Sequence, residues 1–267
     1  MLDKEKVKNN FSRHAHQYDQ HAILQKEMAD ELIRYLGTKV PRGQEKPRNL
    51  DALIPGYFTS ILDIGCGTGY LTNQIFEKLN PQKIIGCDIA PNMIKVAREN
   101  YPNLEFIEAN GENLLFEDGS FDLVISNAAL QWMDINKALI EIHRVLKPNG
   151  TLFFATFGAG TLKELKQLAP HSAHRLPPIL KIQTALKIAG LKISQLDSET
   201  KTVFYSSARE LFSFLKNIGA QNANKNNDGL TGKNKMAKLI KDYEKNYTLN
   251  NKIYASFEVI IGQSSKN

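Results

Sequence analysis

Residues 60–72 of the chain, SILDIGCGTGYLT, decide its fold. The apolar run SILDIG leads into glycines at positions 65, 67 and 69, and a helical pattern begins at Tyr70. A buried strand that turns sharply into a helix is typical of α/β proteins. Glycine lets the backbone turn tightly and lets a ligand approach without meeting a Cβ atom. The GxGxG spacing differs from the GxGxxG of nicotinamide dinucleotide sites, and the Gly-Lys-Ser/Thr ending of a phosphate loop is missing.

Short apolar runs alternate with helical patterns after this segment. Both kinds of element are bounded by Gly, Pro or Asn, and Pro91 suits the first turn of a helix. Alternating strands and helices predict an α/β fold with a doubly wound, mostly parallel sheet. The predicted strands cover 60–65, 83–88, 104–109, 121–127 and 151–157, and the predicted helices cover 70–79, 92–100 and 135–146.

Different patterns flank this core on both sides. Residues 1–37 are predicted to be helical, because Phe11, Ala15 and Tyr18 form one apolar stripe and a longer stripe starts at Leu24. Residues 38–59 contain three prolines and two glycines and are interpreted as a linker. The segment 158–250 is expected to be mostly helical, with helices at 163–168, 179–189 and 207–218 and a weaker strand at 192–196. Residues 251–267 are expected to carry a terminal strand, at 252–262.

Composition excludes several classes of protein. No apolar run approaches the roughly 18 residues of a membrane span, and the first ten residues lack the apolar stretch of a signal peptide. The two cysteines, Cys66 and Cys87, provide neither a disulfide scaffold nor a cysteine-type zinc site. We therefore expect a cytoplasmic protein with reduced thiols.

The net charge of +6 is unevenly distributed. Residues 51–200 carry 16 acidic and 13 basic side chains, whereas residues 201–267 carry 5 acidic and 11 basic ones. A basic protein often has an acidic partner, and nucleic acid is one candidate. Because the central part is acidic and no Asn-Pro-Pro-Tyr base-flipping motif occurs, we do not expect nucleic acid to be the partner.

Asp88 ends the second predicted strand, 19 residues after Gly69. The carboxyl ends of parallel strands meet at one edge of the sheet, so Asp88 is expected to lie close to the glycine loop. A carboxylate there can accept hydrogen bonds from both hydroxyl groups of a ribose. The two features together predict a site for a ligand that contains a nucleoside.

Residues 60–157 resemble the class I S-adenosylmethionine-dependent methyltransferases. The resemblance lies in LDIGCGTGYLT (62–72), IIGCDIAPNMI (84–94), SFDLVISNAALQW (120–132) and HRVLKPNGTLFFATF (143–157). It implies a Rossmann-like, seven-stranded sheet with an N-terminal helical lid and a helical insertion before the last strand. It also implies S-adenosyl-L-methionine as the cofactor.

The same resemblance implies a role for each cofactor residue. The glycine loop cradles the methionine end, Asp63 anchors its amino group and Asp88 holds the ribose. The turn after the third strand borders the adenine, and the turn after the fourth contacts the methionine moiety. Asn110 stands where the family usually has an aspartate, but its amide oxygen can still accept a hydrogen bond from adenine. The implied cofactor residues are Asp63, Gly65, Gly67, Gly69, Asp88, Asn110, Gly111 and Asn127.

Both flanks resemble the malonyl-acyl-carrier-protein O-methyltransferase family of biotin synthesis. The similar segments are NFSRHAHQYDQHA (10–22), HRLPP (174–178), LKNIGA (215–220) and the strand at 254–262. This resemblance implies methyl transfer to the free carboxylate of a malonyl thioester, carried on acyl carrier protein or coenzyme A. The alternative is a related small-molecule methyltransferase that acts on another carboxylic acid or on a quinone-type ring.

A carboxylate acceptor is ionised at pH 7 and needs positioning rather than a general base. The planar guanidinium group of arginine matches a carboxylate. The resemblance favours Arg144 as the ligand of the substrate, while a structural ion pair at a helix end is the other interpretation. Arg13 and Arg175 are the competing candidates.

Three further side chains are candidates for the acceptor side. Tyr18 lies on the N-terminal helix that closes over the cofactor in related enzymes, although its position also suits core packing. Gln131 and Trp132 follow the fourth strand and are expected to line the acceptor pocket, with packing as the alternative for Trp132. The spacing of the three N-terminal histidines does not suggest a helical metal pair, so no metal site is expected.

The lysines at positions 233, 235, 238 and 241 lie close together in the sequence. They are candidates to attract an acidic acyl carrier protein. The alternative is an ordinary solvated helix face. The sequence alone leaves the oligomeric state open.

Overall fold

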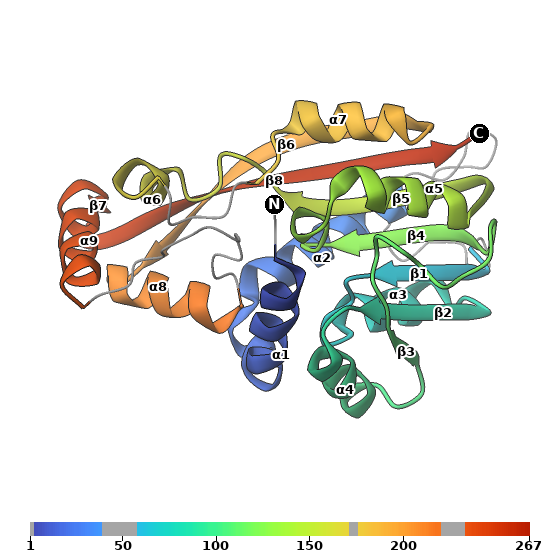
Figure 1. Ribbon diagram of the computed structural model, residues 1–267, viewed down its shortest axis with the longest axis horizontal. Helices are drawn as coiled ribbons and strands as arrows, with labels where there is room; N and C mark the ends of the chain where they lie inside the picture. Colours follow the sequence, from blue (N-terminus) through green and yellow to red (C-terminus); the bar gives the residue numbers. More distant parts are fainter. Residues whose placement is uncertain (1–2, 39–57, 171–175, 220–232) are drawn as a thin grey trace.

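One mixed sheet runs through the computed structural model, which describes residues 3–38, 58–170, 176–219 and 233–267 (Figure 1). Its strand order is β3-β2-β1-β4-β5-β8-β6, and the two-residue β7 pairs with β8. Strands β1 to β5 are parallel, whereas β8 runs antiparallel to both of its neighbours. The predicted α/β fold is confirmed. The strands are β1 (Ser60–Ile64), β2 (Lys83–Asp88), β3 (Glu105–Glu108), β4 (Phe121–Asn127), β5 (Leu146–Phe157), β6 (Leu191–Tyr205), β7 (Thr248–Leu249) and β8 (Lys252–Lys266).

Helices cover both faces of the sheet. Helices α2 and α3 pack on one face, and α5 and α7 pack on the other. Within the described residues, no helix is both long enough and apolar enough to cross a membrane. The helices are α1 (Lys4–His21), α2 (Ile23–Thr38), α3 (Tyr70–Leu79), α4 (Pro91–Asn100), the 3₁₀ turn η2 (Leu130–Trp132), α5 (Ile135–Val145), α6 (Lys163–Leu168), α7 (Ile179–Ile188), α8 (Ala208–Asn217) and α9 (Lys233–Asn246).

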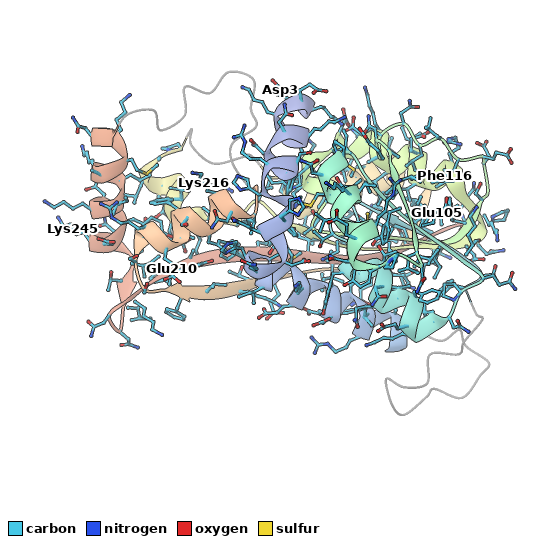
Figure 2. All side chains as sticks on the ribbon, turned by 90° about the horizontal axis from the view of Figure 1, so that it is seen from below. Asp3, Glu105, Phe116, Glu210, Lys216 and Lys245 are labelled. Carbon is cyan, nitrogen blue, oxygen red and sulfur yellow. The ribbon has the colours of Figure 1, made fainter. Side chains whose placement is uncertain are left out.

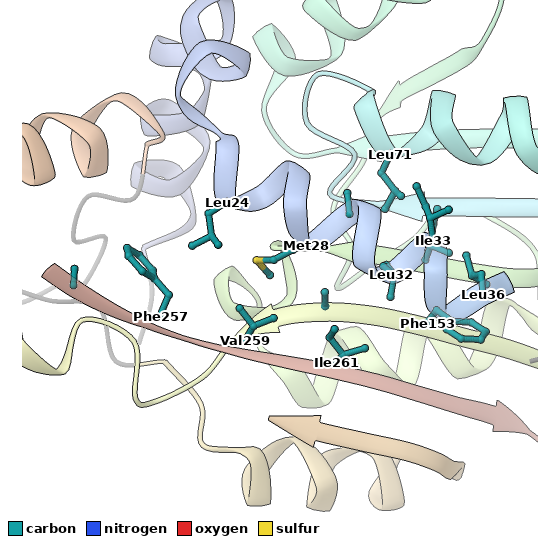
Figure 3. Packing of buried hydrophobic residues seen from close by; sticks show 14 of the residues in the cluster. Leu24, Met28, Leu32, Ile33, Leu36, Leu71, Phe153, Phe257, Val259 and Ile261 are labelled. Carbon is teal, nitrogen blue, oxygen red and sulfur yellow. The ribbon is translucent and has the colours of Figure 1, made fainter. Parts of the chain in front are cut away.

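The apolar runs of the central strands supply both halves of the core. In β1, Ile61 faces one cluster of buried side chains and Leu62 faces the other, because successive side chains of a strand point to opposite faces. Helix α2 presents Leu24, Met28 and Leu32 toward β5 and β8 (Figure 3). A strand buried on both faces has no polar alternation, which is why the sequence shows continuous apolar runs there.

The last part of the sheet is longer than its sequence suggests. The weaker strand expected at 192–196 is β6, which runs over 15 residues and pairs with β8 from Leu191 opposite Lys266 to Tyr205 opposite Ile253. Strand β6 is an edge strand, and most of its residues from Asp197 to Thr202 are exposed and polar. Polar side chains on an edge strand discourage pairing with other proteins, and they also conceal the strand from a hydrophobicity pattern.

Helix α1 crosses the carboxyl edge of the sheet (Figure 1). Helix α1 begins at the N-cap Asp3, whose carboxylate accepts a hydrogen bond from the Lys6 amide, and it ends before Ala22. It packs on α4 through Ala15, Met93 and neighbouring side chains. This helix therefore lies over the loops in which the sequence predicts a site.

Candidate active site

Two connected spaces lie between α1 and the carboxyl ends of β1, β2 and β4. They measure about 670 and 420 Å³, open mouths included. Both are lined by Tyr18, Gly65, Gly67 and Asn127, so they are two halves of one cavity. Asp88, Asn110, Gly111 and Trp132 line only the larger half, and Asp63 lines only the smaller half. The structure thus brings nine of the predicted site residues to one cavity.

The glycine loop forms the floor that both halves share. Gly65 has a φ of +73°, and a Cβ atom on it would lie 2.2 Å from the Cβ of Ala129. Gly67 has a φ of +56° and faces open space, so its backbone is accessible to a ligand. The amides of Gly65 and Cys66 both donate to the Cys87 carbonyl, at 2.7 and 3.0 Å. These bonds fix the loop against the end of β2.

Asp88 links this loop to the start of α4. Its Oδ2 accepts from the Gly67 amide at 3.1 Å, and its Oδ1 accepts from the Ala90 amide at 2.8 Å. A carboxylate has about four lone-pair sites, so acceptor capacity remains toward the cavity. Burial raises the pKa of Asp88 to about 6, although these backbone donors oppose the shift.

Three acceptor oxygens in the smaller half have no hydrogen-bond partner. They are Gln25 Oε1, Asp63 Oδ1 and Asn127 Oδ1, and all three are inaccessible to solvent. Their residues line the same space. Buried polar atoms are nearly always paired, so three unpaired acceptors together indicate a binding site for a ligand with several donors. A protonated amine offers three N–H donors and a positive charge, and it fits this set.

Asp63 is the charged member of this set. Its Oδ2 accepts from Thr72 Oγ1 at 2.6 Å, and only 1% of the residue is exposed. Burial raises the pKa of Asp63 to about 7, the Thr72 hydroxyl opposes the rise, and the charge of Asp88 adds to it. A cationic ligand would stabilise the ionised form.

The junction of α1 and α2 is fastened to the floor of the cavity. Thr68 Oγ1 donates to Asp19 Oδ1 at 2.8 Å, and Asn127 Nδ2 donates to the Gln25 carbonyl at 2.8 Å. Tyr18 directly precedes Asp19 and lines both halves of the cavity. Burial raises the pKa of the Tyr18 phenol, so it is a neutral hydroxyl group at physiological pH.

The larger half has an apolar wall. Phe11 and Trp132 pack edge to face with ring centroids 5.5 Å apart, and Met133 lies beside Gly111. Asn110 Oδ1 accepts from the Glu112 amide at 3.1 Å, which folds the turn around this wall. A flat aromatic group such as a purine fits such surroundings.

Arg144 is placed away from the cavity, which corrects the expectation that it binds the substrate. It lies in the last turn of α5, beside the amino ends of β4 and β5. Its guanidinium group donates to Glu141, to Asp118 and to the carbonyls of Leu114 and Phe116 at 2.7–2.9 Å. Arg144 therefore forms structural ion pairs at the end of a helix, as the alternative interpretation predicts.

Three further candidates, Gly69, Gln131 and Arg13, also lie outside the lining of the two described spaces. Gly69 has a φ of +87° and caps the start of α3. Gln131 is buried behind the wall, where its Oε1 accepts from Thr156 Oγ1 and its Nε2 donates to the Ala128 carbonyl. Arg13 is exposed on α1, and Arg175 lies outside the described residues.

Gln25 is the site residue that sequence reasoning missed. It is 7% exposed on a helix whose stripe of Leu24, Met28 and Leu32 faces the core. The position of this glutamine directly after an apolar residue of the stripe is the sequence feature that could have identified it. Within the described residues, no group of three His, Cys, Asp or Glu side chains could hold a metal ion.

Comparisons with known proteins agree with this geometry. Residues 62–154 match the family model described as a methyltransferase domain. A solved geranyl diphosphate methyltransferase in complex with SAM shares the fold, with a TM-score of 0.56 and 14% identity over 92% of this chain and 87% of that chain.

Two curated relatives match nearly the whole chain. Both are named malonyl-acyl-carrier-protein O-methyltransferase. The relative from Nitrosospira multiformis is 32% identical over 99% of this chain and 90% of its own length. The relative from Acetivibrio thermocellus is 32% identical over 100% of this chain and 95% of its own length. The chain is therefore a methyltransferase, and it belongs to the malonyl-acyl-carrier-protein O-methyltransferase family.

Proposed function

We propose that this chain transfers the methyl group of S-adenosylmethionine to the free carboxylate of a malonyl thioester on acyl carrier protein. The product is the malonyl methyl ester that starts the synthesis of the biotin side chain. One observation carries the cofactor assignment: the three unpaired, buried acceptors of Gln25, Asp63 and Asn127 in one half of the cavity. The names of the curated relatives support the acceptor.

Each part of the cofactor has a counterpart in the cavity. Its ammonium group would donate to the three unpaired oxygens, and its ribose hydroxyls would donate to Asp88. The purine would lie beside Asn110 and the apolar wall of the larger half. When bound, S-adenosylmethionine supplies an electrophilic methyl group on a positively charged sulfur.

The residues of the chain then have to position the acceptor and exclude water. A malonyl carboxylate is ionised at pH 7, so no side chain has to remove a proton from it. Orientation alone can supply a large part of the rate enhancement of such a two-substrate reaction. Tyr18 lies where the two halves of the cavity meet, and we assign it to this junction as a neutral hydroxyl group.

The cofactor assignment is tested by titration calorimetry with S-adenosylhomocysteine, which keeps the amino acid and nucleoside ends. The acceptor is tested with labelled S-adenosylmethionine and with malonyl carrier protein, malonyl coenzyme A and the succinyl carrier protein. We expect binding of S-adenosylhomocysteine and a base-labile label on the malonyl carrier protein. Transfer to an unrelated acceptor, with none to either malonyl thioester, would contradict the proposal.

Helix α9 offers a basic surface to which we expect an acidic carrier protein to bind. Its Lys235, Lys238 and Lys241 are exposed, whereas Leu239 and Tyr243 of the same helix are buried. An acidic protein would be attracted to such a helix face. Replacing Lys238 and Lys241 by Glu should raise the KM for malonyl carrier protein and change that for malonyl coenzyme A little. Charge reversal at the exposed Lys187 of α7 is the matched control.

A further inference from the structure

Four basic side chains gather where the end of α8 packs on α1. They are Arg13, His14 and His21 on α1 and Lys216 on α8, and Figure 2 shows Lys216 beside α1. Two contacts fix the helices here. Asn217 Nδ2 lies 3.2 Å from His21 Nε2, and a Cβ atom on Gly219 would lie 3.1 Å from the ring of Phe11.

This basic cluster has no counter-ion among the described residues. In that part of the chain, no carboxylate oxygen lies within 4.0 Å of a side-chain nitrogen of Arg13 or Lys216. His14 Nε2 is buried and lacks a hydrogen-bond partner. Burial lowers the pKa of His14, and the charges of Arg13, Lys216 and His21 lower it further. An anion is the group that would satisfy all of these features.

His14 also lies next to the wall of the cavity. Phe11 precedes it by three residues and Tyr18 follows it by four, and both line the larger half. Residues three and four positions apart in a helix have Cβ atoms about 5–6 Å apart on one face. A group bound at His14 therefore lies within one helical turn of Tyr18, where the two halves of the cavity meet.

We propose that Lys216 and His14, with Arg13 and His21 around them, bind the carboxylate of the acceptor. This inference rests on the proposed function. It assigns to the basic cluster the substrate-binding role that Arg144 does not fill. A lysine is a point charge, unlike the two-pronged guanidinium of arginine. Together with one imidazole nitrogen, it can hold one carboxylate oxygen and leave the other free to attack the methyl group.

The experiment compares three acceptors in the full-length protein. They are malonyl carrier protein, malonyl coenzyme A and malonyl-N-acetylcysteamine, of which the last has no phosphate. Loss of one charge-assisted contact should raise the KM for all three about 10- to 100-fold in Lys216→Met. Lys216→Arg should recover most of the loss, and Lys187→Met on α7 should match wild type. Unchanged binding of S-adenosylhomocysteine would show that each variant is folded.

A second measurement does not depend on activity. Sodium malonate is titrated while the ring signal of His14 is followed by NMR, with His14→Gln used to assign the signal. We expect malonate to shift this signal and raise the pKa of His14 in wild type, and to do neither in Lys216→Met. The exposed His16 on the same helix is the internal control and should not respond.

The outcomes separate the two proposals. A KM that rises only for the two phosphate-bearing acceptors would assign the cluster to the phosphate of the carrier arm and overturn the inference. Unchanged KM values for all three acceptors would overturn it as well. If wild type methylates no malonyl thioester, the proposed function fails, and the inference then stands or falls on the response of His14 to malonate.

Discussion

Replacing Asp63 by Asn should stabilise the ligand-free protein and weaken cofactor binding at the same time. The change keeps the shape of the side chain and its contact with the Thr72 hydroxyl group. It removes a charge that is 99% shielded from water, since only 1% of the residue is exposed. The two effects have opposite signs, so they cannot both arise from a general disturbance of the fold.

The stability effect follows from the pKa of Asp63. Burial raises it from 3.8 to about 7, so between these pH values the folded protein binds a proton that the unfolded chain has released. The free energy of unfolding therefore decreases as the pH rises through this window, and Asn lacks this cost. The cost amounts to at most about 4 kcal/mol above pH 7. Asp63→Asn should have the higher Tm at pH 8, and the difference should disappear near pH 4.

The binding effect depends on the ionised form of Asp63. With a pKa of about 7, the ionised fraction falls about eightfold between pH 7.5 and pH 6. Asp88, with a pKa of about 6, adds about a further twofold. The affinity of wild type for S-adenosylhomocysteine should therefore fall about 16-fold over this range. In Asp63→Asn the affinity at pH 7.5 should be about 10- to 100-fold lower, and only the twofold pH dependence should remain.

Titration calorimetry at pH 6, 7 and 7.5 measures the affinities, and thermal unfolding of the ligand-free proteins measures stability. Thr72→Val is the companion variant, because it removes a donor to Asp63 and should raise its pKa further. An Asp63→Asn protein that binds S-adenosylhomocysteine as tightly as wild type at pH 7.5 would refute the ammonium site. A Tm below that of wild type for this variant at pH 8 would refute the prediction that the buried charge of Asp63 destabilises the ligand-free protein.

Three other substitutions test separate parts of the structure. Tyr18→Phe removes the hydroxyl at the junction of the cavity halves, so kcat should fall at least about tenfold while the Kd for S-adenosylhomocysteine changes little; equal kcat values would exclude a role for the hydroxyl. Arg144→Met should lower the free energy of unfolding by about 1–3 kcal/mol, because the loop at 114–118 loses its donors, yet leave the KM for the acceptor unchanged. A large increase in the KM for the acceptor in a folded Arg144→Met protein would show that this residue binds the substrate. Gly65→Ala should abolish cofactor binding, because its Cβ would meet Ala129 at 2.2 Å at a positive φ; retained binding would contradict the described loop.

The sequence was informative where the fold itself brings residues together. In a parallel sheet the carboxyl ends of the strands meet at one edge, so Asp63, Asp88 and Asn127 at the ends of their strands and Asn110 in the turn after β3 converge there whatever their separation in the chain. Spacing and residue type were enough to predict that the glycine loop and Asp88 meet there, whereas Asp63, Asn110 and Asn127 were predicted from the family resemblance.

The expectation for Arg144 failed because it did not take into account the direction in which its helix runs along the sheet. Helix α5 runs back from the carboxyl end of β4 to the amino end of β5, so its last turn lies at the opposite edge of the sheet from the site. The motif was identified correctly, but a residue near the end of a crossover helix cannot reach the carboxyl edge. This error was avoidable, because the alternation of strands and helices in the sequence already determines the direction of α5.

Gln25 and the proximity of Lys216 to His14 were missed for a different reason. Each depends on how one helix rotates against another, which a single-chain pattern does not specify. Gln25 is buried only because α2 packs on β4 and β5, where Asn127 donates to the Gln25 carbonyl, and Lys216 lies near His14 only because α8 packs on α1. Likewise, β6 forms because it pairs with β8, and its own polar sequence does not indicate a strand of this length.

The most direct test of the proposed reaction is the position of the transferred methyl group. Malonyl carrier protein is incubated with the enzyme and methyl-labelled S-adenosylmethionine, and the thioester product is analysed by tandem mass spectrometry before and after mild base. We expect the label on the terminal carboxylate as an ester that mild base removes. A base-stable label on the central carbon of the malonyl group, or an unlabelled malonyl thioester, would contradict carboxyl methylation.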